Sequence, residues 1–325
     1  MPSVNSTIVK ADYNSIRDKI VNVLGTGSGN TGWGQDSKIV SSAVSESSKV
    51  TINEWANLRL DIINSWKHIN GSNPVTAQVI EGQTVRYTSS FTPDTGTLDV
   101  PQRQYDVWAD TIVTNRFLVG AGESALSSVQ STSRDGSWIT QSSCIVTFTF
   151  PTANEARYFF NSGGQIRISG SRSGGTTSSQ NTSWTSLLST IGTQGFGGNN
   201  PGTGTSPSNG LNWYRCTNSF QTYYTGSASS PYGSNNLQLQ ARCTDVTSNT
   251  TGTSKSGEIR ILFNDGYVDP ATSPHTPSTV PPEDYVDGVL TANVSYLYAT
   301  GIMVPTSALF TVTQPTVTIG SITAA

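Results

Sequence analysis

The chain has 325 residues, of which only 12% are charged, and its formal net charge at pH 7 is −3. An ordinary soluble protein carries roughly 25% charged residues, so uncharged polar side chains replace many Lys and Glu residues here. Because Lys and Arg are few and scattered, the sequence excludes a basic surface for nucleic acid. No apolar run reaches the ~20 residues of a membrane-spanning helix, so we expect no membrane insertion.

The first predicted helix has Asp12 as its N-cap and ends at Gly25. Its apolar residues recur at spacings of three and four, which places them on one face: Tyr13, Ile16, Ile20 and Val23. The Gly-rich segment 25–34 follows this helix. It lacks both the preceding strand and the Lys-Ser or Lys-Thr of a phosphate loop, so we interpret it as a flexible connector.

A second helix is predicted from Thr51, which forms a capping box with Glu54, to Asn70-Gly71. Its apolar stripe consists of Trp55, Leu58, Ile62, Trp66 and Ile69. Two helices with apolar stripes predict a helical hairpin over residues 1–72, and we expect this region to be an anchor.

Residues 73–130 are predicted to be a connecting region. The weak alternation over 75–91 favours an extended segment. A third helix is predicted over about 101–119, with Gly120 as its stop and a core face of Tyr105, Trp108, Ile112 and Phe117.

From about residue 131 the apolar period changes from 3.6 to 2, which predicts a β-rich domain over 131–325. Thr152 and Glu155 form a capping box for a short helix through Phe160, and Asn181 is the predicted cap of another. The predicted strands are 144–150, 165–171, 211–217, 219–225, 237–243, 258–263, 290–298 and 309–319. The fold class is therefore α+β, with a helical N-terminal region followed by a mainly antiparallel, β-sandwich-like region with short helices.

Metal and cofactor sites are not expected. The three cysteines lie in alternating apolar runs, where a small buried hydrophobe is the favoured interpretation. A Pro-rich loop at about 265–287 is bordered by carboxylates whose spacing differs from that of a calcium loop, and turn formation is favoured for them. They are Asp265, Asp269, Glu283, Asp284 and Asp287.

An enzymatic function is not expected either. His68 and His275 are the two histidines, and no Ser has the GxSxG surroundings of a hydrolase nucleophile. A glycosidase pair of carboxylates has no fixed separation in the sequence.

Aromatic residues are the remaining signal. Trp33, Trp55, Trp66 and Trp108 are concentrated in the N-terminal third and are the candidate assembly interface. Tyr223, Tyr224 and Tyr232 belong to a second aromatic cluster. A strand core or a subunit interface is the favoured interpretation of that cluster, and a glycan-stacking platform is the alternative.

Several stretches resemble virion structural proteins of tailed bacteriophages, especially phages of cyanobacteria. These stretches are NVLGTGSGNTGWGQ (22–35), EWANLRLDIIN (54–64), ARYFFNSGGQIRIS (156–169), WTSLLSTIG (184–192), FNDGYVDP (263–270) and YLYATG (296–301). The resemblance implies a tail, neck, baseplate or fibre-type component and brings no catalytic residues with it. It also implies that the chain is made in the host cytoplasm and resides in the virion.

The leading hypothesis is thus a homo-oligomeric virion subunit that binds other virion proteins. The N-terminal third would dock onto the particle and the β-region would project outward. The alternatives are a host-receptor or glycan-binding module of a fibre and a capsid decoration protein. A polysaccharide depolymerase is the enzymatic alternative, and the sequence lacks the repeats of a β-helix that such enzymes use.

Overall fold

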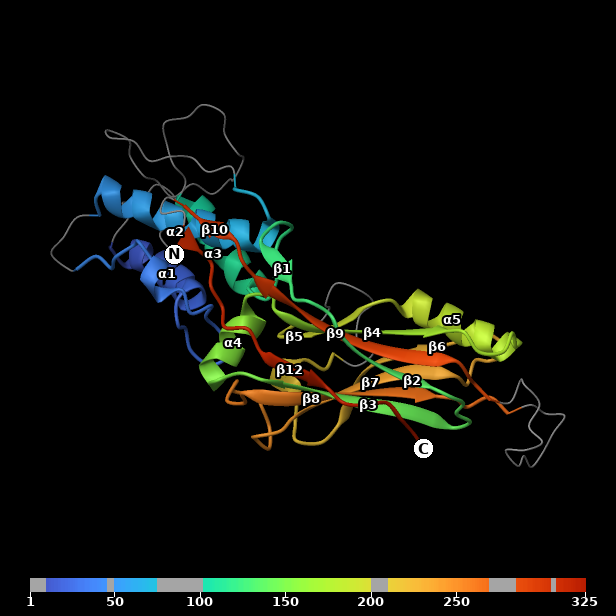
Figure 1. Ribbon diagram of the computed structural model, residues 1–325. Coiled ribbons are helices and arrows are strands. Elements are labelled where there is room, and N and C mark those ends of the chain that lie inside the picture. Colours follow the sequence, from blue (N-terminus) through green and yellow to red (C-terminus); the bar gives the residue numbers. More distant parts are fainter. Residues whose placement is uncertain (1–9, 46–49, 75–101, 200–209, 269–284, 305–307) are drawn as a thin grey trace. The chain divides into compact units, whose positions relative to one another are not determined.

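The computed structural model describes residues 10–45, 50–74, 102–199, 210–268, 285–304 and 308–325 (Figure 1). N-terminal helices are followed by antiparallel sheets, which confirms the predicted α+β class. The described residues form two compact units. The first lies within Met1–Ala125, Arg157–Gly164 and Tyr298–Thr313, and the second within Leu126–Ala156, Gln165–Leu297 and Gln314–Ala325. The division predicted at residues 72 and 130 stays a prediction.

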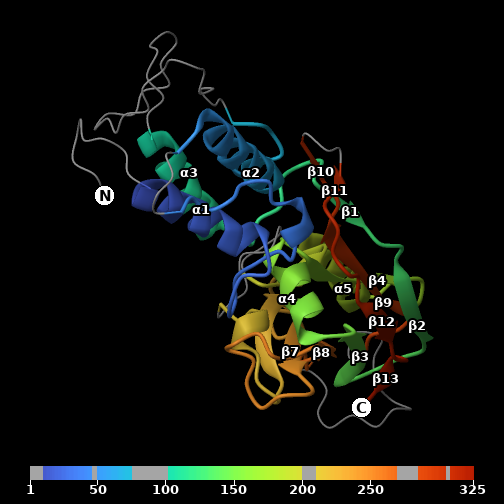
Figure 2. The same cartoon turned by 90° about the vertical axis from the view of Figure 1, so that its left-hand side faces the viewer.

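The first unit is built on three helices, α1 (Lys10–Leu24), α2 (Ile52–Asn70) and α3 (Gln102–Asn115), which lie side by side in Figures 1 and 2. The whole predicted apolar face of α1 is buried. The predicted start at Asp12 is wrong, because α1 already includes Lys10 and Asp12 lies in its first turn. At the other end, the Gly25 N–H donates to the Val21 carbonyl, and the helix ends at the predicted glycine.

The caps of α2 are confirmed. Thr51 accepts a hydrogen bond from the backbone N–H of Glu54, whose carboxylate accepts one from the backbone N–H of Thr51 in return. Gly71 ends the helix at φ 75°, a left-handed conformation that costs glycine little because it has no Cβ.

The predicted C-terminus of α3 is wrong by four residues. The helix ends at Asn115, whose carbonyl accepts a hydrogen bond from Leu118 in a turn. The Gly120 N–H then donates to the carbonyl of His68 in the last turn of α2. A hydrogen bond to α2 therefore takes the place of a further helical bond within α3. Phe117 lies outside α3 and is half-buried. The start predicted at residue 101 and the extended segment at 75–91 lie outside the described residues.

The Gly-rich segment 25–34 is ordered by hydrogen bonds, so its interpretation as a flexible connector is wrong. Trp33 is fully buried, and its indole N–H donates to the carbonyls of Arg116 (2.9 Å) and Asn161 (3.0 Å). Arg157 donates to two further carbonyls of the segment, those of Thr26 and Gly29. The segment is therefore fixed to the first unit, and Trp33 is part of that unit's core.

Two antiparallel sheets in a sandwich-like arrangement contain most of the strands. The first sheet has the order β1-β9-β4-β5, with β2 also paired to β9. Its strands are β1 (Ser124–Leu126), β2 (Gln130–Asp135), β4 (Gln165–Ser173), β5 (Gln194–Gly197) and β9 (Val289–Ala299).

The second sheet has the order β12-β3-β8-β7-β6, with β13 also paired to β3. Its strands are β3 (Gln141–Thr149), β6 (Gln221–Ser227), β7 (Asn236–Cys243), β8 (Ser256–Asn264), β12 (Thr316–Ile319) and β13 (Thr323–Ala324). A short hairpin, β10 (Ile302–Met303) and β11 (Ala308–Leu309), belongs to the first unit.

The interior of the second unit is aromatic. The alternating side chains of β3 bury Phe148, whose ring lies 6.5 Å from that of Phe196 on β5 and 5.6 Å from that of Trp213. Phe196 also lies 5.2 Å from Tyr223 on β6. These contacts join strands of both sheets, which is the layering expected when each sheet has one apolar face.

Both of the predicted short helices exist. At the start of α4 (Ala153–Asn161), the Thr152 hydroxyl accepts a hydrogen bond from the Glu155 N–H, as the predicted capping box requires, and donates one to the Glu155 carboxylate. The cap predicted at Asn181 is wrong. Ser178 caps α5 (Ser179–Ile191) by accepting from the Asn181 N–H.

Two strand predictions are wrong. Residues 211–217 contain a short 3₁₀-helix, Trp213–Arg215, because the Asn212 side chain accepts a hydrogen bond from the Tyr214 N–H and turns the chain. The strand predicted over 309–319 is divided, since β11 ends at Leu309 and β12 begins at Thr316.

Candidate ligand-binding site

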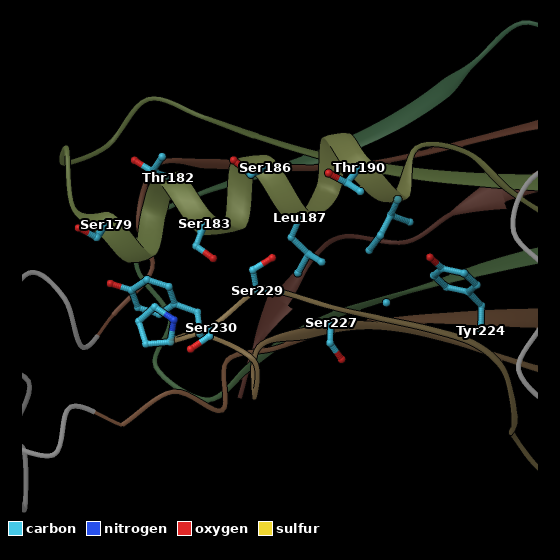
Figure 3. A pocket seen from close by; sticks show the side chains of 15 residues that line it. Ser179, Thr182, Ser183, Ser186, Leu187, Thr190, Tyr224, Ser227, Ser229 and Ser230 are labelled. Carbon is cyan, nitrogen blue, oxygen red and sulfur yellow. The ribbon is translucent and has the colours of Figure 1, made fainter.

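A cleft of about 560 Å³ lies in the second unit, between α5, β6 and the turn that follows β6. Fifteen residues line it, and ten of them carry a hydroxyl group, so we call it the serine-lined cleft (Figure 3). Its volume falls within the roughly 300–1,000 Å³ of clefts that hold small ligands.

Helix α5 forms one wall because its two faces differ. Trp184 and Leu188 are buried and pack the helix onto the unit, where α5 contacts β4. The other face carries hydroxyls at helical spacing: Ser179, Thr182, Ser183, Ser186 and Thr190. Figure 3 shows Ser183 and Leu187 pointing from the helix toward the turn that carries Ser229.

Tyr224 on β6 stands at one end of the cleft (Figure 3). It is 8% exposed, and its hydroxyl forms no hydrogen bond with any residue that the structure describes. A Cβ on Gly226 would lie 2.9 Å from this hydroxyl oxygen and 2.6 Å from Cδ1 of Ile191. Gly226 and Ile191 both line the cleft, so the absent side chain at Gly226 lets the tyrosine hydroxyl reach the cleft wall.

The opposite wall is the turn between β6 and β7. Ser229 and Ser230 are exposed there, while Tyr232 is 7% exposed. The Tyr232 ring makes an edge contact with Tyr267, with 4.6 Å between ring centroids. This contact fixes the ring against the unit while it lines the cleft.

The cleft carries no formal charge, since none of its lining residues is Asp, Glu, Lys, Arg or His. Serine and tyrosine hydroxyls can each donate and accept a hydrogen bond. The arrangement therefore suits an uncharged ligand that has donors and acceptors of its own, whereas a buried ion would lack a counter-charge.

A buried polar cluster holds the first turn of α5. Gln180 donates a 2.6 Å hydrogen bond to the carboxylate of Asp265, which is 6% exposed. Burial raises the pKa of Asp265 to about 7, although the hydrogen bond from Gln180 acts to lower it. The neighbouring Ser179 lines the cleft, so this cluster supports the cleft wall from behind.

The three tyrosines predicted as glycan contacts divide between two places. Tyr224 and Tyr232 line the serine-lined cleft. Tyr223 does not: it is 1% exposed, contacts Phe196 and keeps a buried hydroxyl without a partner among the described residues. Burial raises the pKa of the Tyr223 hydroxyl above its ordinary value of 10. Glycan contact by any of the three stays a prediction.

Most of the predicted assembly-interface tryptophans lie in the core of the first unit. Trp33, Trp55 and Trp108 are 0%, 3% and 7% exposed. Trp66 is half-buried and lies 6.0 Å from Trp108, centroid to centroid. Three of the four rings are thus occupied by packing within the chain, and assembly through them stays a prediction.

Two further candidate residues that the structure describes, His68 and Asp287, have structural partners. His68 is buried, its Nε2 lies 3.0 Å from the Ser162 carbonyl, and burial lowers its pKa to about 4. Asp287 pairs with Arg172 (3.3 Å). The described residues contain no group of three or more His, Cys, Asp or Glu that could hold a metal ion. His275, Asp269, Glu283 and Asp284 lie outside the described residues.

The sequence did not lead us to predict that α5 lines a cleft, although the spacing of its hydroxyl residues indicates a polar face. The hydroxyls at 179, 183, 186 and 190 are spaced by four, three and four residues, which places them on one helical face. Their proximity to Tyr224 and Tyr232 depends on tertiary structure that the spacing does not contain.

No protein-family model, no curated protein and no solved structure matches this chain. In the described part of the chain, no helix has the length and apolar character needed to cross a membrane. The fold and the serine-lined cleft are therefore interpreted from their own chemistry.

Proposed function

We propose that the chain is a structural subunit of a bacteriophage particle, placed in its tail, neck, baseplate or fibre. In this proposal it is made in the host cytoplasm and assembles with copies of itself and with other virion proteins. A capsid decoration protein is the variant of this proposal in which the chain sits on the capsid surface.

The observation that carries the proposal is where the phage-like stretches lie in the fold. Three of them contribute Trp33, Trp55 and Trp184, which are 0%, 3% and 0% exposed. The resemblance therefore concerns residues that build the fold, whereas a shared reaction would require shared residues at a site. This supports a common structural role.

The exposed surface offers a contact for a neighbouring subunit. Ile302 and Leu309 are directly opposite each other in the β10–β11 hairpin and are 51% and 57% exposed. Burying such a pair against another subunit removes apolar area from water, which favours association. The low charge of the chain reduces the cost of desolvating the surrounding surface.

The test is the copy number of the full chain in intact particles. Particles are purified by density gradient from a lysate of the phage that encodes the chain, and the chain is quantified by mass spectrometry against the major capsid protein. We expect a fixed number of copies that survives salt washing, and electron microscopy of a gold-labelled C-terminal tag then locates the subunit. Absence from washed particles would contradict the proposal.

A pair of variants tests the hairpin contact. Ile302→Asp should lower the copy number, because a charge cannot be buried at an apolar subunit contact without a partner. Val268→Asp places the same charge at another exposed apolar residue (66% exposed) and should leave the copy number unchanged. Equal incorporation of both variants would remove the hairpin from the assembly surface.

A further inference from the structure

The serine-lined cleft contains a polar group that the protein leaves without a partner. Tyr224 is 8% exposed, and its hydroxyl has no hydrogen bond with the described residues. It lies beside Gly226 and Ile191 in the cleft wall. The oxygen is not among the fully buried polar atoms, so it stays accessible from the cleft, where a ligand hydroxyl can bond to it.

The lining of the cleft limits the chemistry of the ligand. An anion or a cation would lose its hydration without meeting an opposite charge, because the lining is uncharged. An extended peptide pairs with a strand edge, and β6, the end strand of its sheet, also lines the cleft, so a peptide is the competing occupant in the test. The other wall consists of side-chain hydroxyls on a helix, which favours a ligand with hydroxyls of its own. A ligand that is itself rich in hydroxyls matches donors and acceptors on both sides.

We infer that the serine-lined cleft binds a neutral carbohydrate. The hydroxyl of Tyr224 bonds to a sugar hydroxyl at one end of the cleft. Ser183 and Ser186 on α5 exchange hydrogen bonds with the sugar along its length. The ring of Tyr232, held by Tyr267, provides the apolar surface against which the C–H face of a sugar packs. This activity is additional to particle assembly.

The test uses the purified full chain and defined polymers. Binding is measured by biolayer interferometry on immobilised dextran, a linear β-glucan and a galactomannan, which are neutral. Alginate and a sulfated galactan are the acidic members of the panel, and a Gly-Ser peptide is the peptide member. We expect binding to at least one neutral polymer, insensitive to salt, and no binding to the acidic polymers or the peptide.

Two neighbouring tyrosines give a matched pair of variants. Tyr224→Phe removes only the cleft hydroxyl and should weaken binding about tenfold, the effect of one lost hydrogen bond to a ligand. Tyr223→Phe removes a hydroxyl that does not line the cleft and should leave affinity unchanged. Ser229→Trp, at an exposed position, should block the cleft and abolish binding. Tyr224→Phe and Ser229→Trp should unfold thermally like the parent chain, because the Tyr224 hydroxyl has no partner among the described residues and Ser229 is exposed. Tyr223→Phe should be at least as stable as the parent chain, because it removes a buried hydroxyl without a partner among those residues.

Four results would overturn the inference: no binding to any neutral polymer at saturating concentration, stronger binding to the acidic polymers, binding to the peptide, or equal effects of Tyr224→Phe and Tyr223→Phe. None of these results bears on the copy number of the chain in particles, so the assembly proposal is tested separately.

Discussion

Asp265 should make the stability of the chain depend on pH in an unusual direction. Its carboxyl is 6% exposed and accepts a hydrogen bond from Gln180 in the first turn of α5. Burial disfavours the ionised form and raises the pKa to about 7, against 3.8 for an unperturbed aspartate. The variant Asp265→Asn removes the ionisation while keeping an oxygen that can accept from Gln180.

The size of the effect follows from the shift. About three pKa units at 1.36 kcal/mol each correspond to about 4 kcal/mol between the protonated and the fully ionised carboxyl. Because the folded pKa lies above the unfolded one, the folded state binds more protons between about pH 4 and about pH 7. The free energy of unfolding therefore falls as pH rises through this window, and the contribution is fully present only below about pH 4.

The assay is urea unfolding followed by circular dichroism at about pH 5 and about pH 8. The stability of Asp265→Asn relative to the parent chain should increase by about 3 kcal/mol between the two pH values. Other titrating groups, His68 among them, are common to both proteins and cancel in this difference. Asp135→Asn, at an exposed position on β2, is the control and should follow the parent chain. If the difference between Asp265→Asn and the parent chain does not change with pH, the burial argument for Asp265 is refuted.

Three further predictions concern buried groups. Burial lowers the pKa of His68 to about 4, below its unfolded value of about 6.5, so its contribution to stability is present above about pH 6.5 and is lost as pH falls toward 4. In acid unfolding, His68→Phe should lose this dependence of stability on pH. An acid-unfolding curve identical to that of the parent chain would contradict the prediction. Gly32→Ala should lower the free energy of unfolding in urea by more than about 2 kcal/mol, because φ is +89° and the new Cβ would collide with a backbone carbonyl. Gly29→Ala is the control: its φ is also positive but its Cβ would lie in open space, so it should lower the free energy of unfolding by only about 1 kcal/mol. Burial raises the pKa of the Cys144 thiol to about 12 and also raises the pKa of the Cys216 thiol. Iodoacetamide should therefore modify neither cysteine in the folded chain and both in urea, measured by mass spectrometry.

Local patterns predicted the elements of this fold well wherever neighbouring residues decide the structure. The capping box of Thr51 with Glu54 and the left-handed stop at Gly71 depend on residues within one or two turns of helix. The alternation of apolar and polar residues predicted β3, because one face of this strand is buried. By contrast, residues 211–217 have the composition of a strand, and one side-chain cap at Asn212 was enough to form a 3₁₀-helix instead.

Long-range pairing was outside the reach of those patterns. β9 pairs with β4 although more than a hundred residues separate them, and nothing local specifies that register. The order in segment 25–34 has the same origin, since Trp33 bonds to Asn161, 128 residues away. The candidate site shows both limits together: the tyrosines were recognised by composition, and the helix that faces them was placed by the fold.

The two proposals constrain each other through the position of α5. Its hydroxyl face forms one wall of the serine-lined cleft, so an assembly contact that covered this face would close the cleft. The apolar pair Ile302 and Leu309 belongs to the other compact unit, so a contact there does not use any residue that lines the cleft. If both proposals hold and the assembly contact leaves α5 uncovered, the chain in intact particles must bind the same neutral polymer as the purified chain, and Tyr224→Phe must weaken both to the same extent. A particle that incorporates the chain and hides the cleft would place the assembly surface on α5, and carbohydrate binding would then belong only to the unassembled subunit.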